Sequence, residues 1–363
     1  MDMMYIEDCC EILDSMRVPI TASDREEGEY PYYGANGIQD HVADYIFDDE
    51  LVLLAEDGGN FGSKERPIAY RASGKCWVNN HAHVLKPKAG LDVDYLCYSL
   101  MFYKVDGMVN GATRQKLTQA AMRKMKIPSR SMKEQLHIVD ELNRILKIKE
   151  QRQQELTLLD DLIKARFVEL FGSCKNMVSM NDLCSIITDG THQPPKFQEQ
   201  GIPFIFVSNL VNNTVTYNAE KFISEETYAE LYKRTPIEIG DLLLSTVGSY
   251  GHPAVVTEDR KFLFQRHIAY LKPNREVVNS YYLHSALLAP DGQRQIEEKV
   301  KGIAQKTLNL SEIRKIVIPV PTIEEQNQFE TFVRQVDKSK VAVQKALDET
   351  QLLFDSLMQQ YFG

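Results

Sequence analysis

The sequence predicts an α/β protein with two strand-rich globular domains separated by two long helices that form an antiparallel coiled coil. Three observations lead to this fold class. Part of the 363-residue chain is present twice, each copy ends in a long heptad pattern, and short apolar runs with Gly, Pro and Asn turns fill the remaining segments. A chain of this length is long enough for two domains with separate cores.

The repeat relates residues 110–172 to residues 301–363 without a gap. Many positions are identical in the two copies: Gly111/Gly302, Leu117/Leu308, Arg123/Arg314, Lys124/Lys315, Ile127/Ile318, Pro128/Pro319, Glu134/Glu325, Gln135/Gln326, Phe171/Phe362 and Gly172/Gly363. This agreement indicates one structural unit used twice, and therefore an internal pseudo-two-fold arrangement.

Each copy predicts a short strand followed by a long helix. The strand-like pieces "MKIP" and "IVIP" end at proline, and the helices are expected to start near Glu134 and Glu325, where a carboxylate suits the helix dipole. A heptad stripe with spacings of four and three then runs from Ile138 to Leu170 in the first copy and from Phe329 to Tyr361 in the second, with polar interruptions near the middle. About 37 residues would make a rod of roughly 55 Å, and we expect the two rods to bury their stripes against each other.

The segments between the copies resemble each other more weakly. "NNHAHVLKP" at 79–87 matches "QRHIAYLKP" at 265–273, and "LVLLAEDGGNFGS" matches "DLLLSTVGSYGHP" as an apolar strand followed by a glycine-bounded loop. "GEYPYYGANG" and "GIPFIFVSNL" share Gly, Pro, aromatic residues and a later Asn. We therefore expect the domain order to be globule, rod, globule, rod, with these boundaries: 1–110, 111–172, 173–300 and 301–363.

Composition limits the class of protein. No apolar run approaches the length of a bilayer, and the acidic start "MDMMYIEDCC" lacks the pattern of a signal peptide, so no membrane is expected. Six scattered cysteines indicate reduced thiols and a cytoplasmic protein. The net charge of -9 is unusual for a nucleic-acid binder, although residues 111–172 carry 13 Lys and Arg against 8 Asp and Glu. DNA binding would thus require precise local contacts or a partner.

Motifs of catalysis are missing from the sequence. An amino-methyltransferase would show Asn/Asp-Pro-Pro-Tyr/Phe, and "QPPK" at 193–196 lacks both ends of that signature. The chain has no G-x-x-x-x-G-K-[ST] phosphate loop and no His, Cys and carboxylate cluster with metal-ligand spacing. We therefore expect no catalytic residues and no metal ligands.

Across essentially its whole length, the chain resembles the specificity (S) subunit of type I restriction-modification systems. "RVPITASDREEGEYPYYGANGI", "LLAEDG" and "NNHAHVLKP" resemble one target recognition domain of that family, and "ITDGTHQPPKF", "GIPFIFVSNL" and "GDLLLSTVGSYG" resemble the other common type. The repeated units resemble its two conserved spacer regions. The resemblance implies a non-catalytic subunit that recognises a bipartite target in double-stranded DNA.

The same resemblance implies partners and places the cofactors on them. Such a subunit recruits two adenine methyltransferase subunits and, for cleavage, restriction subunits that act as ATP-dependent translocase and nuclease. S-adenosylmethionine, ATP and Mg²⁺ are then expected on those partners, with no cofactor on this chain.

In the first globule, two segments offer DNA-contacting side chains. The amide of Asn36 in "YPYYGANG" suits an adenine edge, but the same stretch also reads as a turn with its tyrosines packed beneath, and we favour scaffold for the tyrosines. The loop "GGNFGSKERPIAYR" concentrates donors in an acidic domain, and a solvated loop is the alternative. Its candidates are Asn60, Ser63, Lys64, Arg66 and Arg71.

The second globule and the repeats supply the remaining candidates. DNA contacts are predicted at Thr191, His192, Gln193, Lys196, Thr246, Ser249, Tyr250, His252, Gln265 and Arg266. His81 and His267 occupy matched positions, which favours a structural role for both. Arg123, Lys124, Arg314 and Lys315 are either exposed charges or, as the resemblance implies, contacts with the methyltransferase.

A second class of function fits the same layout. A coiled-coil scaffold with two protein- or ligand-binding globular domains would share the repeat and the rods. Such a scaffold would show no sequence-dependent retention of DNA when mixed with a cognate methyltransferase, whereas a specificity subunit would.

Overall fold

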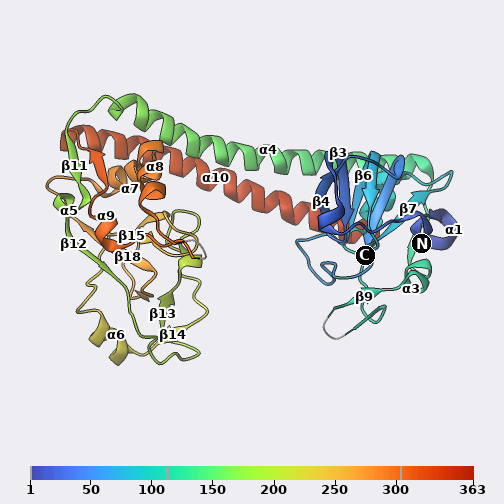
Figure 1. The fold of residues 1–363 in the computed structure, drawn as a ribbon, viewed down its shortest axis with the longest axis horizontal. Coiled ribbons are helices and arrows are strands. Elements are labelled where there is room, and N and C mark those ends of the chain that lie inside the picture. Colours follow the sequence, from blue (N-terminus) through green and yellow to red (C-terminus); the bar gives the residue numbers. More distant parts are fainter. Residues whose placement is uncertain (1, 112–113, 303–304) are drawn as a thin grey trace. The chain divides into compact units, whose positions relative to one another are not determined.

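The computed structural model describes residues 2–111, 114–302 and 305–363 (Figure 1). The chain forms two compact units, Met1–Arg152 with Ala346–Gly363 (unit 1) and Gln153–Lys345 (unit 2). Each unit combines a globule with parts of both long helices, so the boundaries at 110, 172 and 300 stay a prediction. Among the described residues, no helix is both long and apolar enough to span a membrane.

Unit 1 is built on one twisted sheet. Its elements are β1 (Met3–Tyr5), α1 (Ile6–Cys9), β2 (Cys10–Ile12), η1 (Asp14–Met16), η2 (Ala22–Asp24), β3 (Glu27–Gly34), β4 (Gly37–Val42), β5 (Phe47–Ala55), β6 (Ala69–Val78), β7 (Ala82–Pro87), α2 (Val93–Met101), β8 (Val109–Asn110), β9 (Lys116–Leu117), α3 (Gln119–Arg123), β10 (Lys126–Pro128) and part of α4 (Met132–Phe171). Six strands lie in the order β2-β7-β5-β6-β3-β4, and only the β3–β6 pair is parallel.

The central strand β5 is buried on both faces of this sheet. Leu51 and Leu53 enter one apolar cluster while Val52 and Leu54 enter the larger cluster formed with the helices. Successive side chains of a strand point to opposite faces, so a strand covered on both sides reads as the continuous apolar run "LVLLA".

Unit 2 contains a matching sheet and an additional smaller one. Its elements are β11 (Met177–Ser179), α5 (Met180–Leu183), β12 (Cys184–Asp189), β13 (Ile202–Ile205), η3 (Val207–Asn209), β14 (Phe222–Ile223), α6 (Glu225–Leu231), β15 (Leu242–Ser245), β16 (Pro253–Val255), β17 (Leu263–Phe264), β18 (Ile268–Pro273), α7 (Ser280–Leu288), α8 (Pro290–Lys299), α9 (Leu310–Ile313), β19 (Val317–Pro319) and part of α10 (Ile323–Phe362). The sheet β12-β18-β15-β16 corresponds strand for strand to β2-β7-β5-β6.

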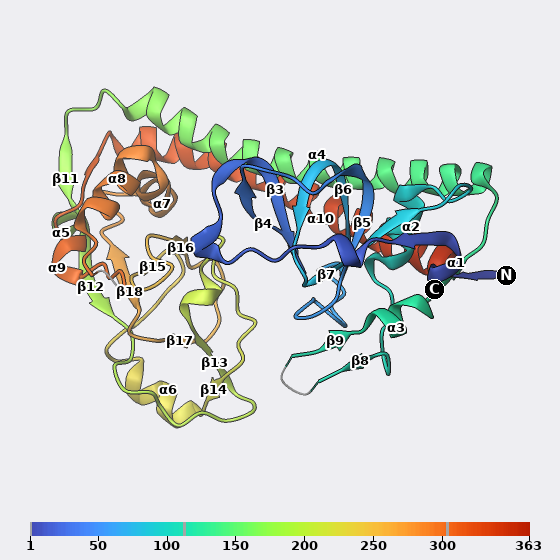
Figure 2. The ribbon, with the colours of Figure 1, turned by 45° about the vertical axis from the view of Figure 1, so that its right-hand side comes forward.

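The two units differ in what is inserted into this shared framework. In unit 1 the insertion is the β3–β4 hairpin, which turns at Gly34–Gly37 and carries the buried Tyr32 on β3. In unit 2 it is the longer segment 190–241, where β13 pairs with both β14 and β17 in a separate three-stranded sheet and α6 lies beside them (Figure 2). The inserted strands still start alike, since β3 pairs parallel to β6 and β13 pairs parallel to β17. The "YPYY" stretch is thus part of β3 and leads into the turn.

Both long helices have 40 residues and begin in the same way. The Glu134 carboxylate accepts from the Ser131 backbone N–H at 2.9 Å, and the Glu325 carboxylate accepts from the Thr322 N–H at 2.9 Å. The hydroxyls of Ser131 and Thr322 complete the two capping boxes. The prediction that these glutamates start the helices is confirmed.

Next to each cap lies a fully buried glutamine. The side-chain oxygen of Gln135 accepts from the Asp92 N–H at 2.8 Å, and that of Gln326 accepts from the Asn279 N–H at 2.8 Å. Asp92 and Asn279 are the N-caps of α2 and α7. The amide nitrogens donate to two backbone carbonyls each, at 2.9–3.1 Å. Each glutamine thereby fixes the start of a long helix to the start of a globule helix.

Within each unit the long helices pack antiparallel. In unit 1, Arg152 donates to the Thr350 hydroxyl at 2.9 Å, while Ile138 shares a core with residues near the end of α10. In unit 2, Lys340 forms an ion pair with Asp160 at 2.7 Å. Numbers rise along one helix as they fall along the other, which confirms the antiparallel coiled coil.

The heptad seam differs from expectation at the end of α4. Phe167 and Phe171 are buried and contact the Phe329 ring at centroid distances of 5.6 and 5.5 Å, whereas Leu170 is 43% exposed. The stripe shifts by one residue because the aromatic rings also pack on Tyr282 of α7. A larger aromatic cluster thus replaces the regular a/d pattern where the helix meets the globule.

All six cysteines are free thiols. Burial raises the pKa of Cys97 to about 12 and that of Cys76 to about 11. Thiols of this kind are inert packing groups rather than nucleophiles.

Candidate nucleic-acid interface

In unit 1, four segments meet beyond the end of β5. They are the turn 34–37, the loop 56–67, the turn 79–81 and residues 114–117, and we call them the unit 1 loop edge. The Asn36 amide donates to the Gly58 carbonyl at 3.0 Å. The Glu56 N–H donates to the His81 carbonyl at 2.9 Å, and its own carbonyl accepts from the Leu117 N–H at 2.7 Å. Backbone hydrogen bonds therefore hold these loops together as one surface.

The unit 2 loop edge, defined as residues 190–196, 246–252, 265–267 and 305–308, has the same scaffold. Thr246 takes the place of Glu56: its N–H donates to the His267 carbonyl at 2.9 Å and its carbonyl accepts from the Leu308 N–H at 2.8 Å. Gly248 N–H then donates to the Lys306 carbonyl at 3.3 Å. The backbone is repeated while the side chains differ. The histidine carbonyls fit the expected structural role of His81 and His267.

The predicted DNA contacts of unit 1 divide into side chains that already have hydrogen-bond partners in the fold and side chains that are exposed. The amide nitrogen of Asn36 is engaged by Gly58, and the Ser63 hydroxyl shapes the loop by accepting from the Arg66 N–H at 2.9 Å. Asn60 is half-buried and its carbonyl accepts from the Ser63 N–H at 3.0 Å. Lys64 and Arg66 are exposed and have no ion-pair partner among the residues that the structure describes. They are the two free cations of this edge.

Arg71 lies on β6 and is not brought together with the other candidates. Its guanidinium contacts the Asp94 carboxylate at 2.7 Å, the Leu51 carbonyl at 2.9 Å and the Glu50 carboxylate. Two carboxylates therefore neutralise its charge and tie β5 and β6 to α2. This arrangement supports a structural role.

In unit 2 the structure brings two candidate groups together. Thr191 forms a bridge with Gln265, and the Thr191 carbonyl accepts from the Arg266 N–H at 3.1 Å. In these two segments His192, Gln193, Lys196 and Arg266 are exposed, and Ser249 is exposed on the segment 246–252. The segments 190–196 and 265–267 therefore present one polar surface.

Three other unit 2 candidates pack inward. Thr246 is buried at 5% exposure, and Tyr250 is half-buried against the apolar core. His252 places Nδ1 3.1 Å from the Asn213 side-chain oxygen, and burial lowers its pKa. Their side chains support the loop from beneath.

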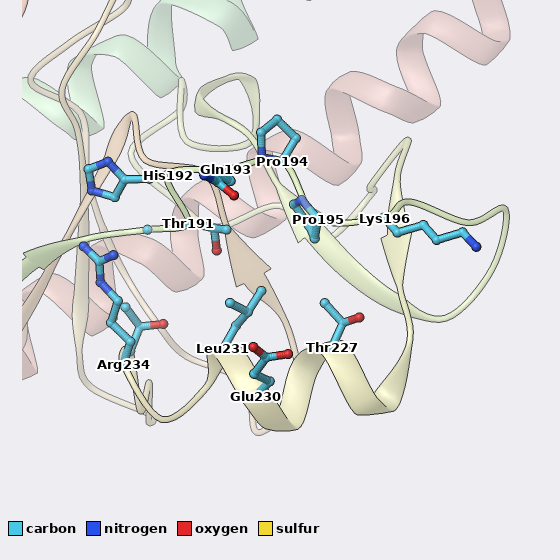
Figure 3. Close-up of a pocket in the computed structure, with 12 residues that line it drawn as sticks. Thr191, His192, Gln193, Pro194, Pro195, Lys196, Thr227, Glu230, Leu231 and Arg234 are labelled. Carbon is cyan, nitrogen blue, oxygen red and sulfur yellow. The ribbon is translucent and has the colours of Figure 1, made fainter.

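A pocket of about 350 Å³ opens between residues 190–196 and the segment around α6. The Asp189 carboxylate contacts His192 Nε2 at 2.9 Å through one oxygen and an Arg234 Nη at 2.7 Å through the other. Figure 3 shows Arg234 directed toward His192, with Glu230 and Leu231 on the α6 side and Lys196 pointing away. Asp189 and Arg234 are not among the residues that the sequence predicts as DNA contacts. Asp189 directly precedes the "GTHQ" candidates, but no local pattern marks Arg234.

The paired basic residues of the repeats divide in the same way in both copies. Arg123 and Arg314 are half-buried, and their guanidinium groups donate to Gln119 and to the Ile187 carbonyl. Lys124 and Lys315 are exposed. The lysines are thus the side chains that a partner could reach.

One buried cluster in unit 1 has the residue types of a metal site. Asp14, Glu56 and His83 place one possible ligand atom each within 4.8 Å of one another. However, Glu56 is paired with Arg17 at 2.6 Å and with Lys116 at 2.9 Å. Two cationic side chains already supply the charge that a metal ion would bring, so this cluster does not fit one.

The cluster instead fastens the loop edge to the sheet. His83 lies 2.7 Å from the Asp14 carboxylate through Nδ1 and 2.9 Å from the Leu117 carbonyl through Nε2. Burial alone would raise the pKa of Asp14, but hydrogen bonds from His83 and Gln119 bring it down to about 2. Asp14 therefore stays ionised inside the fold.

A family model for the type I restriction modification DNA specificity domain matches residues 1–158 and 175–350. The chain belongs to this family. A Haemophilus influenzae protein named as a type I restriction enzyme specificity subunit is 26% identical over 352 residues, covering 91% of this chain and 88% of that protein. The Escherichia coli EcoBI specificity subunit is 30% identical over 177 residues, covering 48% and 37% of the two chains.

Solved structures of type I systems share the fold. The crystal structure of the S subunit from M. genitalium covers 100% of this chain and 96% of its own, with a TM-score of 0.54 at 14% identity. A structure described for complex assembly and conformational transition of the type I restriction-modification system covers 99% and 96%, with a TM-score of 0.57 at 15% identity. The predicted family and fold class are confirmed.

Membership of the type I specificity family defines the class of function. Its members provide the DNA specificity of a multisubunit restriction-modification system and are not its catalytic subunits. DNA and other subunits of such a system are therefore the partners of this chain.

Proposed function

We propose that this chain reads a bipartite target in double-stranded DNA, with unit 1 selecting one half and unit 2 the other. The observation that carries this proposal is the pair of loop edges, which share backbone hydrogen bonds but differ in their exposed side chains. A fixed backbone with exchangeable side chains is what sequence reading requires, because bases are distinguished by donors and acceptors at their edges. In terms of the predicted domains, the readers are residues 1–110 and 173–300.

The exposed cations of the loop edges support contact with DNA. Lys64 and Arg66 extend from unit 1, and Arg266 extends from unit 2 beside His192 and Gln193. Lys64 and Arg66 have no ion-pair partner among the described residues, and Arg266 donates its Nε to His267 Nε2 at 3.2 Å while its side chain stays exposed. Exposed cations of this kind are available for phosphate or guanine. We assign phosphate positioning to Lys64, and base selection to Arg66 and Arg266, whose guanidinium groups can donate to a guanine edge.

The chemistry belongs to partner subunits. We propose that two adenine methyltransferase subunits bind this chain, with the exposed Lys124 and Lys315 in their contacts, and that ATP-dependent restriction subunits join for cleavage. Those partners bind S-adenosylmethionine, ATP and Mg²⁺, and the methyltransferase flips the target adenine. Because this chain carries a net charge of -9, its affinity for DNA alone is low and rises in the complex.

Methylation mapping tests the proposal. Genomic DNA from cells carrying this chain and its methyltransferase is sequenced by a long-read method that detects modified adenine, beside cells from which only this chain is deleted. We expect a split motif with modified adenine in both halves, lost on deletion. An unchanged methylation pattern after deletion would refute the specificity role and favour a scaffold.

Substitutions in each unit test which unit reads which half of the DNA target. Replacing Lys64 and Arg66 together by alanine changes only unit 1, and replacing Arg266 by alanine changes only unit 2. We expect each variant to affect recognition of a different half of the motif. Equal effects on both halves would contradict one reader per unit.

A further inference from the structure

The pocket of unit 2 contains a charged side chain, Arg234, whose orientation is fixed by an ion pair with Asp189. Asp189 ends β12, and its side chain is only 17% exposed. One of its oxygens contacts Arg234 at 2.7 Å, while the Arg234 side chain remains 51% exposed. A guanidinium fixed by a shielded carboxylate keeps its remaining N–H groups in a defined direction. This fixation lowers the entropy lost when those groups bind a ligand.

The pocket belongs to the loop edge rather than to a separate surface. It is lined by Thr191, His192 and Gln193 on one side and by Glu230 and Arg234 on the other. Thr191 is bridged to Gln265 of the same edge. Whatever binds the loop edge of unit 2 therefore has access to this pocket.

The charges that line the pocket favour a base over a phosphate as its ligand. Lys196 and Arg234 are positive, but Glu230 is exposed in the pocket and Asp189 lies behind it. Two carboxylates offset the cations, and a phosphate would meet Glu230 directly. A G·C pair is the better match, because arginine donates to guanine O6 and N7 while a carboxylate accepts from the cytosine amino group.

Resting on the proposed function, we propose that Arg234 recognises a guanine in the half of the DNA target read by unit 2, and that Asp189 is the positioning residue which orients it. Glu230, four residues before Arg234, faces the cytosine of the same base pair. The α6 segment is thus a specificity element without a counterpart among the described residues of unit 1, where the β3–β4 hairpin occupies the corresponding insertion.

The experiment uses the full chain together with its methyltransferase. Methylated motifs are compared for wild type, Arg234→Gln, Asp189→Asn and the control Arg294→Gln. Arg294 is an exposed arginine of α8 that also contacts carboxylates, including Glu298 at 2.6 Å, but it does not line the pocket. Thermal unfolding of each variant separates loss of specificity from loss of fold.

We expect Arg234→Gln to lower discrimination at one guanine by about 10-fold to 100-fold, with the other positions of the motif intact. Asp189→Asn should relax the same position less strongly, and Arg294→Gln should leave the motif unchanged. Uniformly reduced methylation with an intact motif would mean a phosphate contact and would overturn the inference. So would an unaltered motif in Arg234→Gln. Wild-type methylation that does not depend on this chain would instead overturn the proposed function itself.

Discussion

Replacing Gln326 by alanine should destabilise unit 2 far more than its position at the start of a long helix suggests. The side chain is 0% exposed and serves three backbone groups: the Asn279 N–H at 2.8 Å and the Val277 and Pro321 carbonyls at 3.1 and 3.0 Å. An unpaired backbone group costs about 1–3 kcal/mol when water cannot reach it. Val277 is 40% exposed, so we take the lower end and expect a loss of about 3 kcal/mol.

Hydrogen exchange measured by mass spectrometry locates this effect. The amides around Asn279 at the start of α7 should exchange about 100-fold faster in Gln326→Ala than in wild type, since 1.4 kcal/mol corresponds to about tenfold. The control is Gln328→Ala, which removes an exposed glutamine from the same helix and should change little. Gln135→Ala should produce the same loss around Asp92 instead. Stability within about 0.5 kcal/mol of wild type for both Gln326→Ala and Gln135→Ala would refute the reasoning.

Three further predictions concern Asp14, the matched glycines of the repeat and Lys64. The pKa of Asp14 is lowered to about 2, so its ionised form stabilises the fold above about pH 4, and this contribution of about 2 kcal/mol is lost as the pH falls toward 2. Acid titrations followed by circular dichroism should show this dependence in wild type and not in Asp14→Asn. Gly302 has φ +102° and an added Cβ would lie 2.3 Å from the Gln305 carbonyl, so Gly302→Ala should lower the melting temperature, as should Gly111→Ala with its matching geometry. An unchanged melting temperature in both would contradict the strain argument. Lys64→Ala should weaken binding of the methyltransferase complex to all target sequences about equally and reduce the salt dependence of binding, measured by fluorescence anisotropy at several salt concentrations; a change in base preference would assign it to reading instead.

The parts of the fold that the sequence predicted rest on local or repeated patterns. The capping residues Ser131 and Glu134 are three apart, and the heptad positions recur along one helix, so both are visible in the sequence. Because the chain contains two copies of the repeat, each element could be predicted from two stretches of sequence. Their agreement is why the matched strands and the antiparallel helices could be inferred. Where tertiary packing overrides the local pattern, as at Phe167 and Leu170, the sequence prediction was off by one residue.

The candidate site was predicted less completely because its contacts join distant residues. The loops that carry Lys64 and Thr191 were found from their glycines and donors. Asp189 and Arg234 are 45 positions apart, and only the fold brings them within 2.7 Å. Arg71 illustrates the opposite case: its charge suggested a DNA contact, but Asp94 on the following helix occupies it. A charged residue in a sequence could bind DNA, but only the fold shows whether it is already paired with a residue of opposite charge.

The division of the chain also has a consequence for its synthesis. Unit 2 lies within Gln153–Lys345, whereas the core of unit 1 includes Phe354 and contacts made by Tyr361 and Phe362. During translation the globule of unit 1 is therefore made before that of unit 2. Its apolar surface is covered only after the last turns of α10 have been made. Unit 2 can complete its own contacts sooner. The globule of unit 1, although it is made before that of unit 2, is thus completed after it, and its uncovered apolar surface is exposed to aggregation or chaperone binding in the interval.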